Sequence, residues 1–426
     1  MSSIDARGCS VTGATPSALA AYERSLAAFQ SWRSGVEPAL AVALQEAPAF
    51  VMAHALQAYL LLGSRDPRKV RLARPVLARA AGLPANPRER LHLAAIAAAL
   101  GDDYASAKTR LGEVLKQHPL DVLALQVVHM LDHVTGDVAR MHDRVASVMP
   151  AWSRDLPGHH AVLAMHAFSL EESGEYGRAE DVACAALALN PLDARAHHAM
   201  AHVFEMSERV DAGLRWMNAH RDFWSVDTVV ATHGWWHVAL FHVAQRRFEE
   251  ALGLYDQRVR AQPSCEIADL IDASALLWRL ELAGGDPGRR WAELATAWGA
   301  YIDDGFCSFN DLHAMLAFVG ARDWDRSRQL ERALVRSQAL PTRHGESTRQ
   351  VGLPSCRALI AFGHGNDTLA ITLLASLPEL AHRLGGSHAQ RDVLNLTLLR
   401  AVERIRRPAR RRPRPEKSPL ALLRGG

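Results

Sequence analysis

The chain has 426 residues, 49% of them hydrophobic, and a formal net charge of +3. This length and composition allow a large buried core, and the five scattered cysteines, which include no CxxC pair, argue against a disulfide framework or a structural zinc site. The first residues lack the apolar core of a signal peptide, and the two longest uncharged stretches, residues 47–64 and 228–245, contain histidine and fit buried helices better than membrane spans. We therefore expect a cytoplasmic protein that does not contact a membrane.

Residues 1–34 are predicted to form an N-terminal arm and the first helix. The arm is expected to be loose. Thr15 is suited to cap a helix over residues 16–32, because its neighbour Pro16 would then occupy the first helical position, where proline is favoured. The repeats described next begin after this segment.

A spacing of 72 residues recurs in the following part of the chain. It relates Tyr104, Tyr176 and Phe248; Ala107, Ala179 and Ala251; and Pro119, Pro191 and Pro263. Each block reads as the second half of a tetratricopeptide repeat, a motif of about 34 residues, so the spacing corresponds to two slightly long repeats. Period-2 alternation is nearly absent, and alanine and leucine dominate the apolar positions. Residues 35–402 are therefore predicted to form an all-α solenoid of tetratricopeptide-like helix pairs, curled round a polar concave groove.

Glycine, proline and capping residues predict where the paired helices begin and end. The expected pairs are residues 86–101 with 104–117, 161–173 with 176–189, 194–207 with 210–223, and 229–244 with 248–261. Beyond residue 284, glycine and proline punctuate a more divergent half of the domain. The last helix is expected to begin after Gly385 and Gly386, with Ser387 as its N-cap.

The last segment, residues 403–426, is strongly basic. From Arg404 onward it contains eight arginines and one lysine against one glutamate, interrupted by prolines. Because proline cannot continue a helix, this tail is predicted to be disordered. A solubilising extension is favoured over an arm that binds nucleic acid or an acidic partner, because no aromatic residue lies among the arginines.

Polar residues gather at the groove positions of three successive repeats. In a tetratricopeptide repeat the first helix of each pair lines the groove. Aligning the repeats on their fixed alanine and proline places there Glu171 and Glu172; then His198, His202 and Glu205; then His233, Trp236 and His237. Residues at i, i+4 and i+7 share one helical face, and neighbouring helices lie about 8–10 Å apart, so these side chains can converge.

Imidazole beside carboxylate can serve two kinds of chemistry. A carboxylate fixes the tautomer of a histidine and raises its basicity, which suits general acid–base catalysis by His202, Glu205 and His233. Together with His198, the same residues offer the ligands of a divalent metal with an open position. The alternative is that these histidines are core residues, hydrogen-bonded to their neighbours. The sequence requires no cofactor and leaves a divalent metal open.

Two phrases in the C-terminal half have no packing role in a plain solenoid. Residues 309–313 contain Asn310, Asp311 and His313, and residues 385–392 contain Gln390, Arg391 and Asp392. If the solenoid closes enough for both phrases to face the groove, we expect a single cavity bordered by His202, His233, His313 and Arg391. The alternative for Arg391 and Asp392 is a helix cap or an ion pair between helices.

Closure of the solenoid would extend both sets of candidate site residues. The catalytic candidates, if the protein is an enzyme, become His202, Glu205, His233, His313 and Asp311. The ligand-binding candidates are Glu172, His198, Trp236, His237, Asn310, Gln390, Arg391 and Asp392.

These motifs resemble the tetratricopeptide repeat protein 38 family. The matching phrases are His198-Ala-Met-Ala-His202-Val-Phe-Glu205-Met206, His233-Gly-Trp-Trp236-His237, Phe309-Asn310-Asp311-x-His313, Val351-Gly352-Leu353-Pro354-x-Cys356 and Leu384-Gly-Gly-Ser-His-Ala-Gln390-Arg391-Asp392-Val. The likeness extends from about residue 30 to residue 402 and leaves out the extreme N-terminus and the basic tail. It implies a soluble all-α repeat protein and brings no established reaction with it.

Three interpretations of function follow. The favoured one is a tetratricopeptide-repeat protein that binds a small molecule or a partner peptide segment in a concave pocket lined by His, Glu and Trp. An acidic peptide terminus is not expected as the ligand, because the groove positions lack the Lys, Arg and Asn that clamp carboxylates. The alternative is an enzyme that uses the His, Glu and Asp residues for general acid–base or metal-assisted chemistry, such as hydrolysis or isomerisation. The third is a structural adaptor whose polar residues serve only packing.

Overall fold

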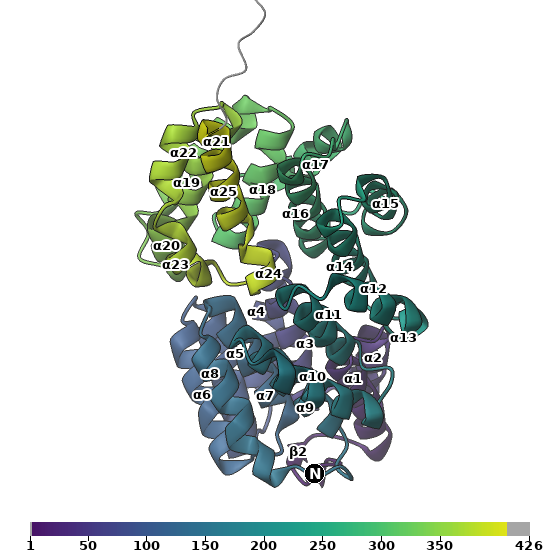
Figure 1. Cartoon of the computed structure of the whole chain (residues 1–426). Helices are drawn as coiled ribbons and strands as arrows, with labels where there is room; N and C mark the ends of the chain where they lie inside the picture. Colours follow the sequence, from purple (N-terminus) through teal and green to yellow (C-terminus); the bar gives the residue numbers. More distant parts are fainter. Residues whose placement is uncertain (1, 407–426) are drawn as a thin grey trace, which may run out of the picture.

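The computed structural model describes residues 2–406, which form an all-α helical-repeat fold of the solenoid type, as the sequence predicts (Figure 1). Helices follow one another in pairs, and successive pairs stack side by side from the purple N-terminal end to the yellow C-terminal end. Among the described helices, none is both long enough and apolar enough to cross a membrane.

The N-terminal arm is a β-hairpin and not the loose segment that the sequence predicts. Strands β1 (Ser2–Ile4) and β2 (Ser10–Thr12) pair in antiparallel orientation. The backbone N–H of Thr12 donates to the Glu89 carboxylate at 2.7 Å. Because this bond joins residues far apart in the chain, no local pattern could indicate it.

The N-terminal half begins with a helix capped as predicted, since the Thr15 hydroxyl accepts from the backbone N–H of Ala18 at 3.2 Å. Its helices are α1 (Pro16–Gln30), α2 (Val36–Glu46), α3 (Val51–Gly63), α4 (Pro67–Ala81), α5 (Pro87–Leu100), α6 (Tyr104–Gln117), α7 (Val122–Thr135), α8 (Val138–Val148) and the 3₁₀ turn η1 (Met149–Ala151). The predicted pairing of α5 with α6 is confirmed.

The middle of the chain contains the helices that carry the polar stripe. They are α9 (His159–Glu172), α10 (Tyr176–Leu189), α11 (Ala194–Met206), α12 (Val210–Ala219), α13 (Arg221–Ser225), α14 (Ala231–Ala244), α15 (Phe248–Leu254), the π-helix η2 (Tyr255–Val259) and α16 (Ile267–Ala283). The predicted pairs are present with two differences. The helix expected over residues 210–223 is interrupted at His220, and the one expected over 248–261 becomes a π-helix after Leu254.

The C-terminal half has shorter and less regular helices. They are α17 (Arg290–Trp298), η3 (Gly299–Tyr301), α18 (Ser308–Gly320), α19 (Trp324–Ser337), α20 (Arg343–Ser347), η4 (Thr348–Gly352), α21 (Leu353–Gly363), α22 (Asp367–Leu374), α23 (Leu377–Leu380), η5 (Ala381–Leu384), α24 (His388–Arg391) and α25 (Val393–Arg406). Ser387 caps α24 as predicted. Helix α25 continues past residue 403, where the tail was predicted to begin, and the rest of the predicted tail, residues 407–426, lies outside the described residues.

The 72-residue spacing reflects packing within the helix pairs. Ala107, Ala179 and Ala251 are fully buried. They lie on α6, α10 and α15, the second helices of pairs that pack on α5, α9 and α14. A methyl group lets the two helices of a pair approach closely, so the same small residue recurs at each contact.

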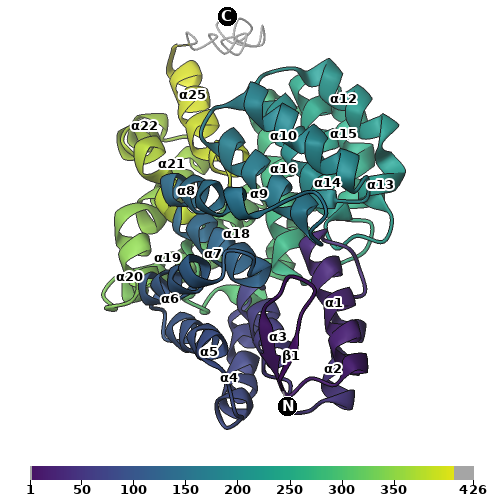
Figure 2. The same cartoon turned by 90° about the horizontal axis from the view of Figure 1, so that it is seen from below.

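The solenoid closes on itself, because its C-terminal half packs against its N-terminal helices (Figures 1 and 2). The backbone N–H of Arg343 donates to the Asp102 carboxylate at 2.7 Å. Gly136, at the end of α7, has a φ of +69°, and a Cβ at this position would collide with the carbonyl group of His382 in η5. This closure brings the short helix α24 into contact with α11.

Candidate metal centre

Four histidines face one another across two neighbouring helices. Helix α11 carries His198 and His202, and α14 carries His233 and His237. Within each pair the two residues are four apart, so they share one face of their helix. Because α11 and α14 pack against each other, the two pairs meet. We call this group the four-histidine centre.

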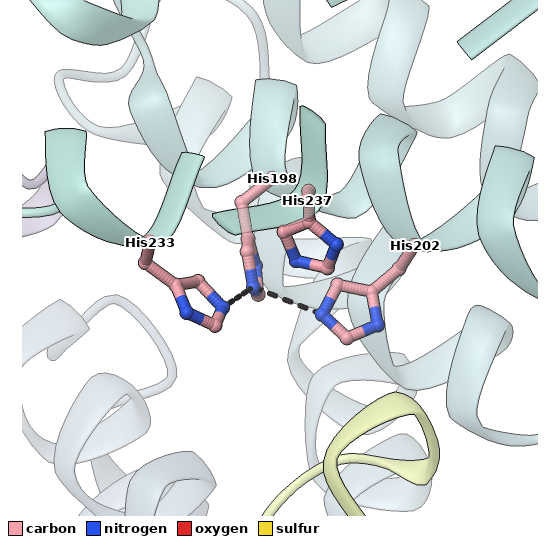
Figure 3. A group of neighbouring side chains, drawn as sticks. All are labelled: His198, His202, His233 and His237. Carbon is pink, nitrogen blue, oxygen red and sulfur yellow. Dashed lines mark hydrogen bonds between the residues drawn. The ribbon is translucent and has the colours of Figure 1, made fainter. Parts of the chain in front are cut away.

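The four rings gather around one point (Figure 3). Nε2 of His198 lies 3.0 Å from Nε2 of His233 and 3.0 Å from Nε2 of His202. One ring nitrogen from each of the four residues lies within 4.8 Å of the others. Nε2 of His237 is buried and has no hydrogen-bond partner among residues 2–406. The arrangement therefore has the ligand types and the spacing of a metal site.

Carboxylates orient two of the rings by bonding Nδ1, the ring nitrogen that faces away from the other histidines. Nδ1 of His233 donates to the two oxygens of Asp272 at 3.0 and 2.9 Å, and Nδ1 of His237 donates to Glu205 at 2.8 Å. A neutral imidazole with its proton on Nδ1 presents a bare lone pair at Nε2. A carboxylate behind a histidine is also the usual outer partner of a metal ligand, because it fixes the ring and raises its basicity.

The close approach of these nitrogens favours a positive charge between them. If His198 donates from Nε2, its single N–H can point to only one of its two neighbours, so a second pair of nitrogens meets at 3.0 Å without a proton. Either an extra proton or a metal ion relieves this conflict. Nitrogens bound to one tetrahedral ion at about 2.0–2.1 Å lie roughly 3.3 Å apart. The His198–His233 and His198–His202 pairs are near this separation at 3.0 Å, and all four nitrogens lie within 4.8 Å of one another.

Burial keeps most of the centre in the state that binds metal. It lowers the pKa of His198, His202 and His237 well below the ordinary value, and the other rings of the group lower it further. These three rings are therefore neutral near pH 7, as metal ligation requires. Burial would also lower the pKa of His233, but Asp272 outweighs it and the pKa is raised. Of the four rings, His233 is therefore the one whose surroundings favour an extra proton.

Two adjacent glutamates of α9 approach the centre near His202. Glu172 accepts from the backbone N–H of His388 at 2.8 Å and pairs with Arg391 at 3.2 Å. An oxygen of Glu171 lies 3.6 Å from Nδ1 of His202. Burial and the charge of Glu172 raise the pKa of Glu171 well above its usual range, and neither of its oxygens has a hydrogen-bond partner among residues 2–406. The surroundings of Glu171 therefore favour its protonated form.

A cavity of about 530 Å³ opens beside the four-histidine centre. His198 and His233 lie in its wall, whereas His202 and His237 are fully buried and do not contribute to it. A metal ion held between the four rings would therefore have two of its ligands facing the cavity.

Aromatic rings and the C-terminal segment complete the wall of the cavity. Phe168 stacks on His198 with ring centroids 5.6 Å apart, and Trp32 meets the same ring edge-on at 5.2 Å. Residues 384–387 and Gln390 also line the cavity. The space is therefore polar near the histidines and largely apolar elsewhere.

The structure brings many of the predicted site residues together. The residues of this group are Glu172, His198, His202, Glu205, His233 and His237. Gln390 lies in the cavity wall, and Arg391 reaches the centre through its ion pair with Glu172. Trp236 supports the centre but does not line the cavity, because it is fully buried and stacks on His233 with centroids 5.1 Å apart.

The phrase at residues 309–313 does not join the four-histidine centre. Asp311 pairs with the buried His344 at 3.0 Å, and Nδ1 of His313 donates to the carbonyl of Phe309 at 2.8 Å. Asn310 donates to the carbonyl of Arg65 at 3.0 Å and so helps to close the solenoid. These contacts hold α18 between α16 and α21, and they correct the expectation that Asp311 and His313 lie beside the other candidate residues.

The expectation of one cavity bordered by four predicted residues needs the same correction. Only His233 of the four lies in the cavity wall; His202, His313 and Arg391 are buried behind it or away from it. Asp392 does not line the cavity either, and its carboxylate contacts Asn395 at 3.5 Å.

The sequence analysis missed Asp272, the carboxylate that orients His233. Asp272 lies on α16, 39 residues beyond its partner. One local signal pointed to it: it is the lone acid between Leu270-Ile271 and a run of small and apolar residues that extends to Trp278. A buried helix seldom carries a carboxylate without a partner, so such a residue marks a polar contact.

No protein-family model matches this chain.

Proposed function

We propose that this protein holds a divalent transition metal in the four-histidine centre and uses it on a small molecule bound in the adjoining cavity. The observation that carries the proposal is the convergence of four imidazoles whose Nε2 atoms lie as close as 3.0 Å, with carboxylates behind His233 and His237. Proton transfer alone needs one or two histidines, whereas four around one point suit a metal ion.

The donor set favours particular ions. Neutral imidazoles suit zinc, copper, iron and nickel, whereas magnesium and calcium prefer oxygen ligands. A tetrahedral zinc ion bound by all four rings would keep no position for a substrate. An ion that takes five or six ligands would keep positions open towards the cavity beside His198 and His233. Iron, nickel or copper therefore fits a reactive centre better than zinc.

The size of the cavity favours a small molecule over a peptide segment. Its volume of about 530 Å³ falls within the range of roughly 300–1,000 Å³ that is typical of small-molecule sites. Residues 384–387 form part of the cavity wall. They therefore cover part of the concave groove in which an extended peptide would lie. The proposal includes a tetratricopeptide-like scaffold and membership of the tetratricopeptide repeat protein 38 family. Neither of them assigns a reaction.

The position of Glu171 favours metal-assisted catalysis over binding of the small molecule alone. A bound metal ion lowers the pKa of a coordinated water or polarises a carbonyl or phosphoryl group, which serves hydrolysis or isomerisation. Glu171 is a buried acid next to His202; its raised pKa favours the protonated form, and its oxygens have no hydrogen-bond partner among residues 2–406. In that form it could donate a proton towards the centre when charge develops there.

Metal analysis tests the proposal directly. The purified full-length chain should contain stoichiometric iron, nickel or copper by mass spectrometry, and the His202→Ala and His237→Ala variants should lose most of it. His197→Ala is the matched control, because His197 is a buried histidine of the same helix whose Nε2 donates to the carbonyl of Pro191 at 2.9 Å, away from the centre.

Melting curves distinguish loss of metal from loss of fold. Each variant should change the free energy of unfolding by about 1–2 kcal/mol, within the usual range for point mutants. A protein that takes up no transition metal after reconstitution, or a His202→Ala/His237→Ala double variant that keeps it, would refute the metal centre. Unfolding of the His202 variant alone would support the interpretation of His202 as a core residue.

A further inference from the structure

The cavity wall contains four arginines that form no ion pair within residues 2–406. Three of them, Arg65, Arg195 and Arg343, also lie over aromatic rings, which distinguishes them from Arg33. Among the buried arginines of the described residues, Arg7, Arg88 and Arg391 pair with acids, whereas Arg279 does not. The half-buried arginines of the cavity wall therefore differ from most of the buried ones.

Each of the three guanidinium groups lies over an aromatic ring. The guanidinium carbon of Arg195 is 4.4 Å from the ring centre of Trp32, that of Arg65 is 5.2 Å from Phe309, and that of Arg343 is 5.0 Å from Tyr104. Stacking on a ring positions a guanidinium group but leaves its N–H groups free to donate in the plane.

Their hydrogen-bonding capacity is largely unused. Nε of Arg195 is buried and has no hydrogen-bond partner among residues 2–406. The side chain of Arg65 donates no hydrogen bond within the same range. Nη2 of Arg343 donates to the carbonyl of Val134, and the other N–H groups of this guanidinium form no further hydrogen bond within residues 2–406. Burial lowers the pKa of Arg195 to about 10 and also lowers the pKa of Arg65, which reflects the cost of keeping these cations without counter-charge.

The acids of the cavity wall do not supply the missing counter-charge. Asp272 accepts from His233 and Glu37 is exposed. Burial raises the pKa of Asp269, which disfavours its charged form. None of the three forms an ion pair with a cavity arginine. Positive charge therefore exceeds negative charge inside a partly apolar space.

We propose that the cavity binds an organic anion whose carboxylate or phosphate group lies against Arg65, Arg195 and Arg343. The apolar part of the molecule would contact Trp32, Phe168 and Phe309, which line the same space. Planar guanidinium groups with free N–H donors match the oxygens of both anionic groups. This inference rests on the proposal that the cavity holds a small molecule, and it reverses the expectation, drawn from groove positions alone, that the site suits no carboxylate.

The anion-binding side chains lie next to the four-histidine centre. The charge of Arg65 opposes protonation of His233, so the two groups are within electrostatic reach. Arg65 also interacts with Asp272 and Arg343. An anion held there would bring the adjoining part of the molecule to the open side of a metal ion, which would account for arginines and histidines sharing one wall.

Calorimetry with matched probe pairs tests the inference. 4-Phenylbutyrate and phenyl phosphate are titrated into the full chain, with and without metal, beside the neutral partners 4-phenylbutanamide and phenol. A charge-assisted hydrogen bond contributes about 1.5–3 kcal/mol, so at least one anion should bind roughly tenfold more tightly than its neutral partner. The anion that shows the larger ratio distinguishes a carboxylate site from a phosphate site.

Variants assign the effect to the proposed side chains. Arg65→Gln and Arg195→Gln should each abolish the preference for the anion. Arg33→Gln is the matched control, because Arg33 also lines the cavity but lies over no aromatic ring within residues 2–406, and its Nη1 donates to the carbonyl of Phe223 at 3.0 Å. Equal binding of anions and neutral partners, or a preference that survives both variants, would overturn the inference. A chain that takes up no transition metal after reconstitution but still prefers anions would support this inference and refute only the metal centre.

Discussion

The carboxylate of Asp272 offers a sharp test of the four-histidine centre. Its side chain is 5% exposed, and both of its oxygens lie within 3.0 Å of Nδ1 of His233. Replacing Asp272 by Asn preserves the shape of the residue and removes its negative charge. The amide oxygen can still accept from the ring, so the fold should survive, but Nε2 of His233 becomes less basic towards a metal.

The size of the effect follows from the role of outer carboxylates. Loss of such a partner weakens metal binding by about 10–100-fold, which corresponds to roughly 1.4–2.7 kcal/mol. Because an Asn side chain can keep the orientation of His233, we expect Asp272→Asn to fall near the lower end of this range. Asp272→Ala, which also removes the acceptor, should fall near the upper end.

A competition titration against a chromophoric chelator at pH 7.5 measures this change. Asp269→Asn is the matched control, because Asp269 lies one turn earlier on α16 and lines the same cavity, yet forms no hydrogen bond with the four histidines within residues 2–406. It corrects for the loss of one negative charge near the metal. Equal affinities for wild type and Asp272→Asn, or an equal loss in both variants, would refute the proposed role of Asp272.

Two further predictions concern stability. Burial would raise the pKa of Asp121, but His92 and Arg88 lower it far below the ordinary value. A depressed pKa contributes stability that is present above the unfolded value of about 4 and is lost as the pH falls below it. Urea unfolding should therefore show Asp121→Asn well below wild type at pH 7 and the gap shrinking below pH 4; a constant gap would contradict this. Gly136→Ala should lower the melting temperature more than Gly174→Ala. Both have positive φ, but only at Gly136 would the new methyl group collide with η5. Equal losses would mean that closure at η5 does not depend on this contact.

Local patterns in the sequence determine the helical pairs and the stripe of polar residues. Thr15 caps α1, and α6 and α10 begin and end at the predicted residues, because caps and helical periodicity act between residues a few positions apart. The pairs His198–His202 and His233–His237 share a face for the same reason. Their convergence could be predicted because consecutive repeats stack as neighbours.

Contacts between distant segments decided the rest. The hairpin at the N-terminus depends on Glu89, and the orientation of His233 depends on Asp272. Residues 309–313 resemble a polar site in sequence, yet Asp311 pairs with His344, His313 donates to the carbonyl of Phe309, and Asn310 donates to the carbonyl of Arg65. The arginines of the cavity come from segments that meet only when the two halves of the chain close. No residue spacing within a repeat predicts that these segments come together. Only the tertiary structure therefore shows that the arginines lie in the same cavity wall as His198 and His233.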